Sequence, residues 1–90
     1  MIEKFFEAFR NLYERKNNRY KNAYLRYGTK GEVMRICVKA DRLYNVVWKA
    51  DKFEDPEYLK REIMDIAVLS MLALDCIERN NFDGEENSGD

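Results

Sequence analysis

The 90-residue sequence contains no histidine, and this absence excludes several kinds of functional site. Without an imidazole group there is no Ser-His-Asp triad, no Cys-His pair and no histidine-ligated zinc or iron centre. Any bound metal would be a hard cation held by oxygen atoms. Mg²⁺ or Mn²⁺ on carboxylates is the cofactor that this composition favours.

Cysteine, proline and glycine are also scarce. Cys37 and Cys76 do not form a CxxC pair and occupy apolar positions of helical patterns, so we expect reduced core thiols in a cytoplasmic protein rather than a disulfide. A single proline and four glycines leave long uninterrupted stretches, which predicts an all-α fold. The longest apolar stretch is shorter than a membrane span and contains acids, so no membrane partner is expected.

The size of the chain limits its core. Ninety residues make one small domain, and 46% apolar with 37% charged residues is typical of a globular protein. A chain of this length buries only about 60 to 65% of its unfolded surface. We therefore expect a homodimer or a higher homo-oligomer to complete the fold.

The charges divide between the two halves of the chain. Residues 10–42 hold ten Lys and Arg against three acids, a local charge of +7, whereas residues 43–90 hold five against twelve, a local charge of −7. This division suits a site in which a basic wall meets phosphates and an acidic wall holds a metal. It equally suits two solvated faces or two subunits of complementary charge.

Apolar side chains recur at steps of three and four residues in three segments, which predicts a small bundle of three main helices. The helices are expected at residues 2–16, 31–50 and 56–80, within a single helical domain over residues 1–80. The acidic residues 81–90 are expected to form a disordered tail.

The third predicted helix has the clearest start and the most apolar surface. Asp55 can cap it, Pro56 suits its first position and Glu57 favours the positive end of the helix dipole. Between Ile63 and Ile77 its polar residues are Asp65, Ser70 and Asp75. A helix that is apolar on nearly every side is either central in its domain or shared with a second subunit, which also favours a dimer.

Basic and aromatic residues alternate between the first two predicted helices, over residues 19–31. Tyr20, Tyr24 and Tyr27 would share one side of a short helical segment. Such a segment could stack on a nucleotide base and pair with phosphates, with Tyr20 and Tyr24 as candidate base contacts. The alternative is a linker whose tyrosines pack on the bundle.

Two acids, Glu62 and Asp65, open the apolar stretch of the third helix. Their spacing of three residues places both carboxylates on one inward face. Asp41 flanks the apolar stripe of the second helix, so we expect it to be half-buried and to face them. Three converging carboxylates could hold Mg²⁺, while Lys39 and Arg42 bind phosphates. The alternative is that the two acids form structural ion pairs with nearby lysine or arginine side chains.

Residues 16–24, 39–43 and 65–67 together carry a family pattern. A lysine precedes a Tyr-centred turn and an aromatic residue, Lys-x-x-Arg precedes an aliphatic residue, and an Asp leads an apolar helix. This pattern resembles the nucleotide-modification-associated domain found in many phage and some bacterial proteins. The resemblance extends over residues 12–77 and implies a phage or mobile-element origin.

That family is similar to the MazG-like and dUTPase-like all-α nucleoside triphosphate pyrophosphatases. Those oligomeric bundles hydrolyse nucleoside triphosphates with Mg²⁺ held by an ExxE pair and a later ExxD pair, and residues 62–65 match the ExxD. The resemblance implies that Glu62 and Asp65 ligate Mg²⁺ and that Asp41 is a third ligand or orients water in catalysis. Lys39 and Arg42 would then contact phosphates.

The chain departs from this pattern in two places. The second helix lacks the ExxE, because Val38 and Tyr44 lie three residues before and after Asp41, and Arg19 and Lys21 replace the Asp and Gly of the Tyr-centred turn. We therefore expect a Mg²⁺-dependent nucleotide-binding protein that is a candidate pyrophosphohydrolase. The alternative is a non-catalytic, homodimeric interaction module that binds a protein or nucleic acid through its basic segment.

Overall fold

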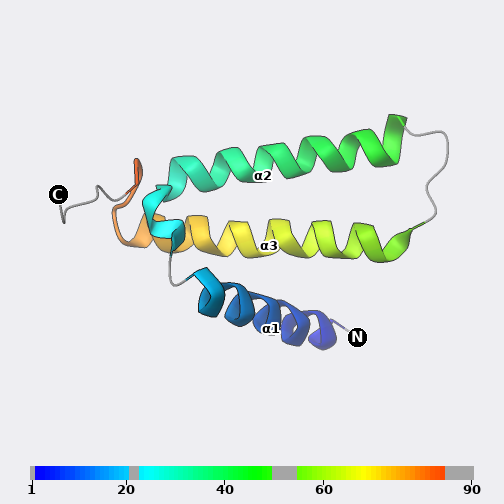
Figure 1. Cartoon of the computed structure of the whole chain (residues 1–90), viewed down its shortest axis with the longest axis horizontal. Helices are drawn as coiled ribbons and strands as arrows, with labels where there is room; N and C mark the ends of the chain where they lie inside the picture. Colours follow the sequence, from blue (N-terminus) through cyan, green and yellow to red (C-terminus); the bar gives the residue numbers. More distant parts are fainter. Residues whose placement is uncertain (1, 21–22, 50–54, 85–90) are drawn as a thin grey trace.

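The computed structural model describes residues 2–20, 23–49 and 55–84, without the side chains of residues 18–20 and 49. It confirms the all-α prediction and the three main helices (Figure 1). In chain order the elements are α1 (Glu3–Tyr20), the short 3-10 helix η1 (Ala23–Arg26), α2 (Gly28–Tyr44), the π-helical turn η2 (Asn45–Lys49) and α3 (Pro56–Glu78). None of the helices in the described ranges is long and apolar enough to cross a membrane.

Helices α2 and α3 form an antiparallel pair, and α1 lies against α3 (Figure 1). The buried apolar side chains are few and come mainly from α3: Tyr24, Val68, Leu69, Ala73 and Cys76. Cys76 is fully buried, as predicted for a core thiol. Cys37 is exposed, so its predicted core position is wrong.

The start of α3 agrees with the sequence. The Asp55 carboxylate accepts hydrogen bonds of 3.1 Å from the backbone N–H groups of Glu57 and Tyr58, and Pro56 occupies the first turn. These contacts satisfy N–H groups that have no partner within the helix. At the other end Asn80 adopts a left-handed conformation with φ 56°, which ends the helix close to the expected residue.

The boundaries of the other two helices were less predictable. Helix α1 continues to Tyr20 instead of ending near Lys16. Asparagine destabilises a helix by only a few tenths of a kcal/mol, so two asparagines alone do not end it. Helix α2 begins at Gly28, three residues earlier than expected. The φ of Gly28 is 69°, which lets the chain turn sharply from η1 into α2.

Residues 81–84 connect the end of α3 to the beginning of α2. The backbone N–H groups of Thr29 and Lys30 donate to the carbonyl groups of Asn81 and Phe82, over 2.9 and 3.0 Å. A Cβ atom on Gly84 would lie 2.2 Å from the Arg26 carbonyl oxygen, so the approach requires glycine. Residues 81–84, the beginning of the predicted tail, thus make defined contacts with η1 and α2. The rest of that tail, residues 85–90, lies outside the described residues.

Candidate functional site

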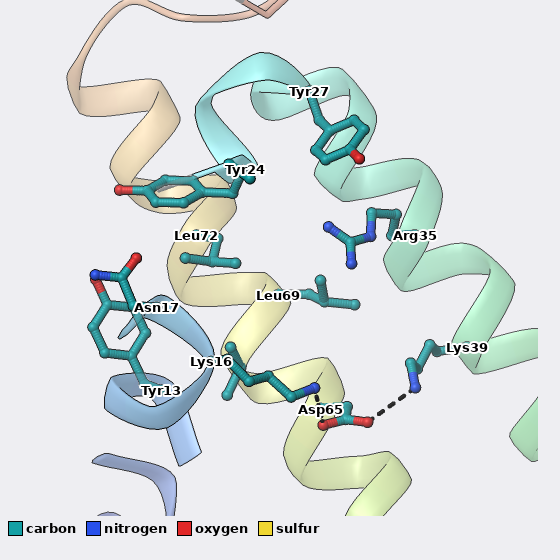
Figure 2. Close-up of a pocket in the computed structure, with 12 residues that line it drawn as sticks. Tyr13, Lys16, Asn17, Tyr24, Tyr27, Arg35, Lys39, Asp65, Leu69 and Leu72 are labelled. Atoms are coloured by element: carbon teal, nitrogen blue, oxygen red, sulfur yellow. Dashed lines mark hydrogen bonds and ion pairs between the residues drawn. The ribbon is translucent and has the colours of Figure 1, made fainter. Parts of the chain in front are cut away.

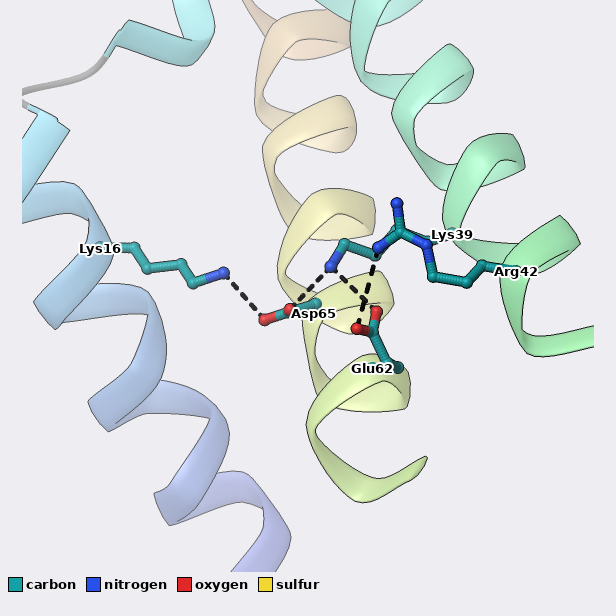
Figure 3. Close-up of polar contacts among 5 residues, drawn as sticks. All are labelled: Lys16, Lys39, Arg42, Glu62 and Asp65. Atoms are coloured by element: carbon teal, nitrogen blue, oxygen red, sulfur yellow. Dashed lines mark hydrogen bonds and ion pairs between the residues drawn. The ribbon is translucent and has the colours of Figure 1, made fainter. Parts of the chain in front are cut away.

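A single lysine lies between the two predicted site acids (Figure 3). The Lys39 Nζ atom is 2.9 Å from Oε2 of Glu62 and 2.9 Å from Oδ2 of Asp65. On the far side of Asp65, the Lys16 Nζ atom is 2.8 Å from Oδ1. Arg42 approaches Glu62 more loosely, at 3.9 Å. We call Lys16, Lys39, Arg42, Glu62 and Asp65 the ion cluster.

The ion cluster joins all three main helices. Glu62 and Asp65 lie one turn apart on α3 and face inward, as predicted, with 12% and 18% of their side chains exposed. Lys39 extends from α2 and is 24% exposed, and Lys16 comes from the last turns of α1. Carboxylates with so little exposure to solvent need a positively charged partner. These lysines provide the positive charge that a metal ion would otherwise provide.

Burial and the ion pairs act on the pKa values of the cluster in opposite directions. Burial raises the pKa of the Asp65 carboxyl group, but the hydrogen bonds and the charges of Lys16 and Lys39 together hold this pKa below its ordinary value. Burial likewise lowers the pKa of the Lys39 ammonium group, yet the hydrogen bonds to both acids and their negative charges together bring the net pKa above the ordinary value. The charged forms of both groups are therefore favoured.

Asp41 does not join these acids, so the predicted convergence of three carboxylates is wrong. Its side chain is exposed, and its Oδ2 atom lies 3.5 Å from the amide nitrogen of Asn45. Asp41 follows Lys39 by two residues, which rotates it by about 200° around α2. Within the described residues no group of three or more acidic or cysteine side chains could hold a metal ion. The arrangement does not fit a resident Mg²⁺ ion, because Lys39 already occupies the position between Glu62 and Asp65.

A pocket of about 330 Å³ opens beside the ion cluster (Figure 2). Its floor is apolar and belongs to α3, whereas its walls are aromatic and basic. The lining residues are Tyr13, Lys16, Asn17, Ala23, Tyr24, Tyr27, Arg35, Lys39, Asp65, Val68, Leu69 and Leu72. The volume lies at the lower end of the range for small-molecule sites, about 300 to 1,000 Å³.

The tyrosines of the pocket differ in their freedom to contact a ligand. Tyr24 lines the pocket but is buried, and its hydroxyl group donates a hydrogen bond to Asp75, while burial and this contact raise its pKa. Tyr27 is half exposed at the rim, 5.3 Å from the guanidinium of Arg35. Tyr13 completes the aromatic wall. The side chain of Tyr20, the other predicted base contact, lies outside the described residues.

The sequence identified only part of this site. Lys39, Asp65 and Tyr24 line the pocket, whereas Arg42 and Glu62 belong to the ion cluster beside it. Tyr13 and Arg35, which also line the pocket, are not among the residues that the sequence predicts for a site. The tyrosine spacing that includes Tyr27 was a usable signal for the pocket rim. The position of Lys16 in the family-like pattern was a second signal.

One buried acid close to the pocket has no counterpart in the sequence predictions. Glu32 is fully buried in α2, and its Oε1 atom lies 3.2 Å from Nη1 of Arg35, one turn along the same helix. Burial raises the pKa of the Glu32 carboxyl group, and the Arg35 charge and hydrogen bond offset only part of this effect. Arg35 therefore lines the pocket and also forms an ion pair with this acid.

Comparisons of the chain with protein-family models, with curated protein sequences and with solved structures gave no match.

Proposed function

We propose that the pocket binds a nucleotide or deoxynucleotide. The observation that supports this proposal is the combination of aromatic rings, basic side chains and an apolar floor in one small cavity. A base can pack on Leu69 and Leu72 against the ring of Tyr27, as bases do on aromatic side chains elsewhere. Lys16, at the mouth of the pocket, and Arg35, on its wall, can donate hydrogen bonds to phosphate oxygens.

The charge of the ion cluster limits the number of phosphates. Three cations, Lys16, Lys39 and Arg42, neutralise two carboxylates, which leaves one positive charge, while Arg35 is paired with Glu32. One surplus charge suits a nucleoside monophosphate better than a triphosphate. A triphosphate would need to bring Mg²⁺ with it, since that ion neutralises phosphate charge.

Hydrolysis does not form part of the proposal. The expected likeness to MazG-type pyrophosphatases supports a nucleotide as ligand, but the third carboxylate of the expected metal centre lies elsewhere on α2. Lys39 would have to leave Glu62 and Asp65 before these two acids could ligate a metal ion. The proposal is thus a binding protein in which Lys39 stabilises the site.

Thermal unfolding and calorimetric titration test this function. We expect the unfolding midpoint to rise with particular nucleoside monophosphates without metal, and with triphosphates only when Mg²⁺ is present. Lys16→Gln and Tyr27→Leu should each weaken binding about tenfold, since each removes one ligand contact while Lys39 still neutralises Asp65. Lys60→Gln, an exposed cation remote from the pocket, is the control. No midpoint shift with any nucleotide, with or without Mg²⁺, would refute the proposal.

A second candidate function is an interaction module, and it rests on the exposed apolar surface. Many large apolar side chains are 40% exposed or more, among them Val33, Tyr44, Trp48, Ile63 and Ile77. Such clustering exceeds the scattered exposure usual for a monomer and marks a surface for association. The positive charge of residues 10–42 would allow an acidic protein or nucleic acid as a further partner.

A further inference from the structure

The apolar stripe of α2 faces solvent instead of α3. Val33, Cys37, Ala40, Tyr44 and Val47, from α2 and the following turn, recur at alternating steps of four and three residues, and all are exposed. The face turned toward α3 contains the buried Glu32, the cluster residue Lys39 and, on the same side of the helix, the half-buried Ile36 and Leu43. Helix α2 is therefore apolar on a second side that α3 does not cover, and an exposed apolar stripe of this length indicates that another surface covers it.

Helix α3 carries a second stripe of the same kind. Its members are Ile63, Ile66, Ser70, Leu74 and Ile77. Ile63, Leu74 and Ile77 are 56%, 55% and 54% exposed, and the stripe contains no charged residue. Spacing at three and four residues without charge is typical of surfaces where helices pack on helices.

Both stripes lie on the side of the α2–α3 pair opposite the pocket. Cys37 precedes Lys39 by two residues, and Ile63 and Ser70 precede the pocket residues Asp65 and Leu72 by two. Two residues correspond to about 200° around a helix, so the stripes point away from the pocket. They form one continuous apolar face, which we call the open face.

We infer that the open face binds a second copy of this chain, so that two α2–α3 pairs form a four-helix arrangement. The face is about 25 Å long and about 20 Å wide, from the helix length and the usual distance between packed helices. The product of these lengths is about 500 Å², less than the roughly 800 Å² that each partner buries in an interface of standard size, so we expect a dimer of modest affinity. An uncharged face offers nothing to a highly charged partner such as nucleic acid, whereas it complements itself.

The charges beside the open face also fit a symmetric pair. Lys39 lies level with Glu62 and Asp65, so Asp41 on α2 and Lys60 on α3 are near the same end of the antiparallel pair. Both are exposed. Each is two residues, or about 200°, from an inward-facing residue of its helix, Lys39 or Glu62, and so lies at the outer edge of that helix. A two-fold axis along the helices places α2 of one copy over α3 of the other. Asp41 then comes close to Lys60 of the partner subunit, and symmetry repeats this contact.

The inference is independent of nucleotide binding. The open face and the pocket lie on opposite sides of α2 and α3, so both can be occupied together. Loss of dimerisation with retained nucleotide binding, or the reverse, would separate the two proposals.

Sedimentation velocity on the full chain tests the inference, with the helical circular dichroism signal as the check on folding. We expect a species of about twice the 10.8 kDa chain mass at micromolar concentration. Cys37→Glu combined with Ile63→Glu should raise the dimer dissociation constant at least about 100-fold. Val38→Glu is the matched control, because Val38 is equally exposed but lies on another face of α2. A monomeric wild-type chain at about 100 μM, or a double variant as dimeric as the control, would overturn the inference.

A charge exchange tests the two-fold orientation separately. Asp41→Lys should weaken the dimer about tenfold, and adding Lys60→Asp should restore it. Because both positions are exposed, neither substitution threatens the fold. Equal dissociation constants for the single and the double variant would overturn the proposed orientation of the two copies.

Discussion

Two groups of buried carboxylates in this protein are neutralised in different ways. Glu62 and Asp65 on α3 are paired with cations from α1 and α2, so their ion pairs hold separate helices together. Glu32 on α2 has its ion pair with Arg35 of its own helix, one turn away, although it is the more deeply buried acid. The ion pairs of Glu62 and Asp65 therefore fix the tertiary structure, whereas the ion pair of Glu32 only lowers the free-energy cost of burying its charge.

The largest effect is expected from Lys39→Met. This change leaves two poorly exposed carboxylates without their shared cation, which should lower the free energy of unfolding by about 3 kcal/mol. Urea denaturation followed by circular dichroism measures it. Lys30→Met, at the exposed ion pair with Asp83, should change the same quantity by less than about 0.5 kcal/mol. A loss below about 1 kcal/mol for Lys39→Met would mean that the ion cluster does not hold the helices together.

A smaller effect is expected from Asp65→Asn. The folded-state pKa of Asp65 lies below its ordinary value of 3.8, so its stabilising contribution is full above that pH and is lost as the pH falls through the folded-state pKa. The variant should therefore be less stable by about 2 kcal/mol at pH 7, and the difference should shrink below about pH 4. Denaturation at several pH values measures this convergence. A difference that is independent of pH would argue against a charged Asp65 in the folded chain.

The opposite sign is expected for Glu32→Gln. The folded-state pKa of Glu32 is raised above 4.5, so the wild-type chain is penalised increasingly as the pH rises through that value. Glutamine keeps an acceptor for Arg35 without the buried charge. We expect the variant to be more stable by up to about 1 kcal/mol at pH 7 and equal to wild type in acid. If it is less stable at pH 7, the local pair with Arg35 contributes more than burial costs.

The smallest effect is expected from Arg42→Gln. Its guanidinium nitrogen is 3.9 Å from Glu62 and its side chain is half exposed, so solvent screens the pair. The free energy of unfolding should fall by less than about 0.5 kcal/mol, by the same urea assay, and the change should disappear at high salt. A salt-independent loss of more than 1 kcal/mol would place Arg42 beside Lys39 in importance.

Local sequence signals predicted the third helix and the inward direction of its two acids. Asp55 and Pro56 define the start of α3 through contacts within a few residues, and the spacing of Glu62 and Asp65 fixes their common face. Such features depend on short-range geometry alone. The sequence left two partners open for these acids, a metal ion or a lysine or arginine side chain, and did not decide between them.

The direction of α2 could not be predicted in the same way. Periodicity shows which side chains share a face of a helix, but it does not show which face meets the rest of the chain. The apolar pattern predicts that the side through Cys37 faces the core, and this direction would bring Asp41 beside the other acids. In the structure the side through Cys37 is exposed, whereas Glu32 and Lys39 turn inward together with the half-buried Ile36 and Leu43. The start of α2 likewise depends on Gly84, which is more than fifty residues away.

The contact between residues 81–84 and the start of α2 determines how α2 and α3 are aligned along their axes. Backbone hydrogen bonds from Thr29 to Asn81 and from Lys30 to Phe82 fix how far α2 can slide along α3. A shift by one helical turn would move Lys39 about 5.4 Å, out of reach of Glu62 or Asp65. Gly28 and Gly84, which allow this close approach, therefore set the position of Lys39, eleven residues after Gly28.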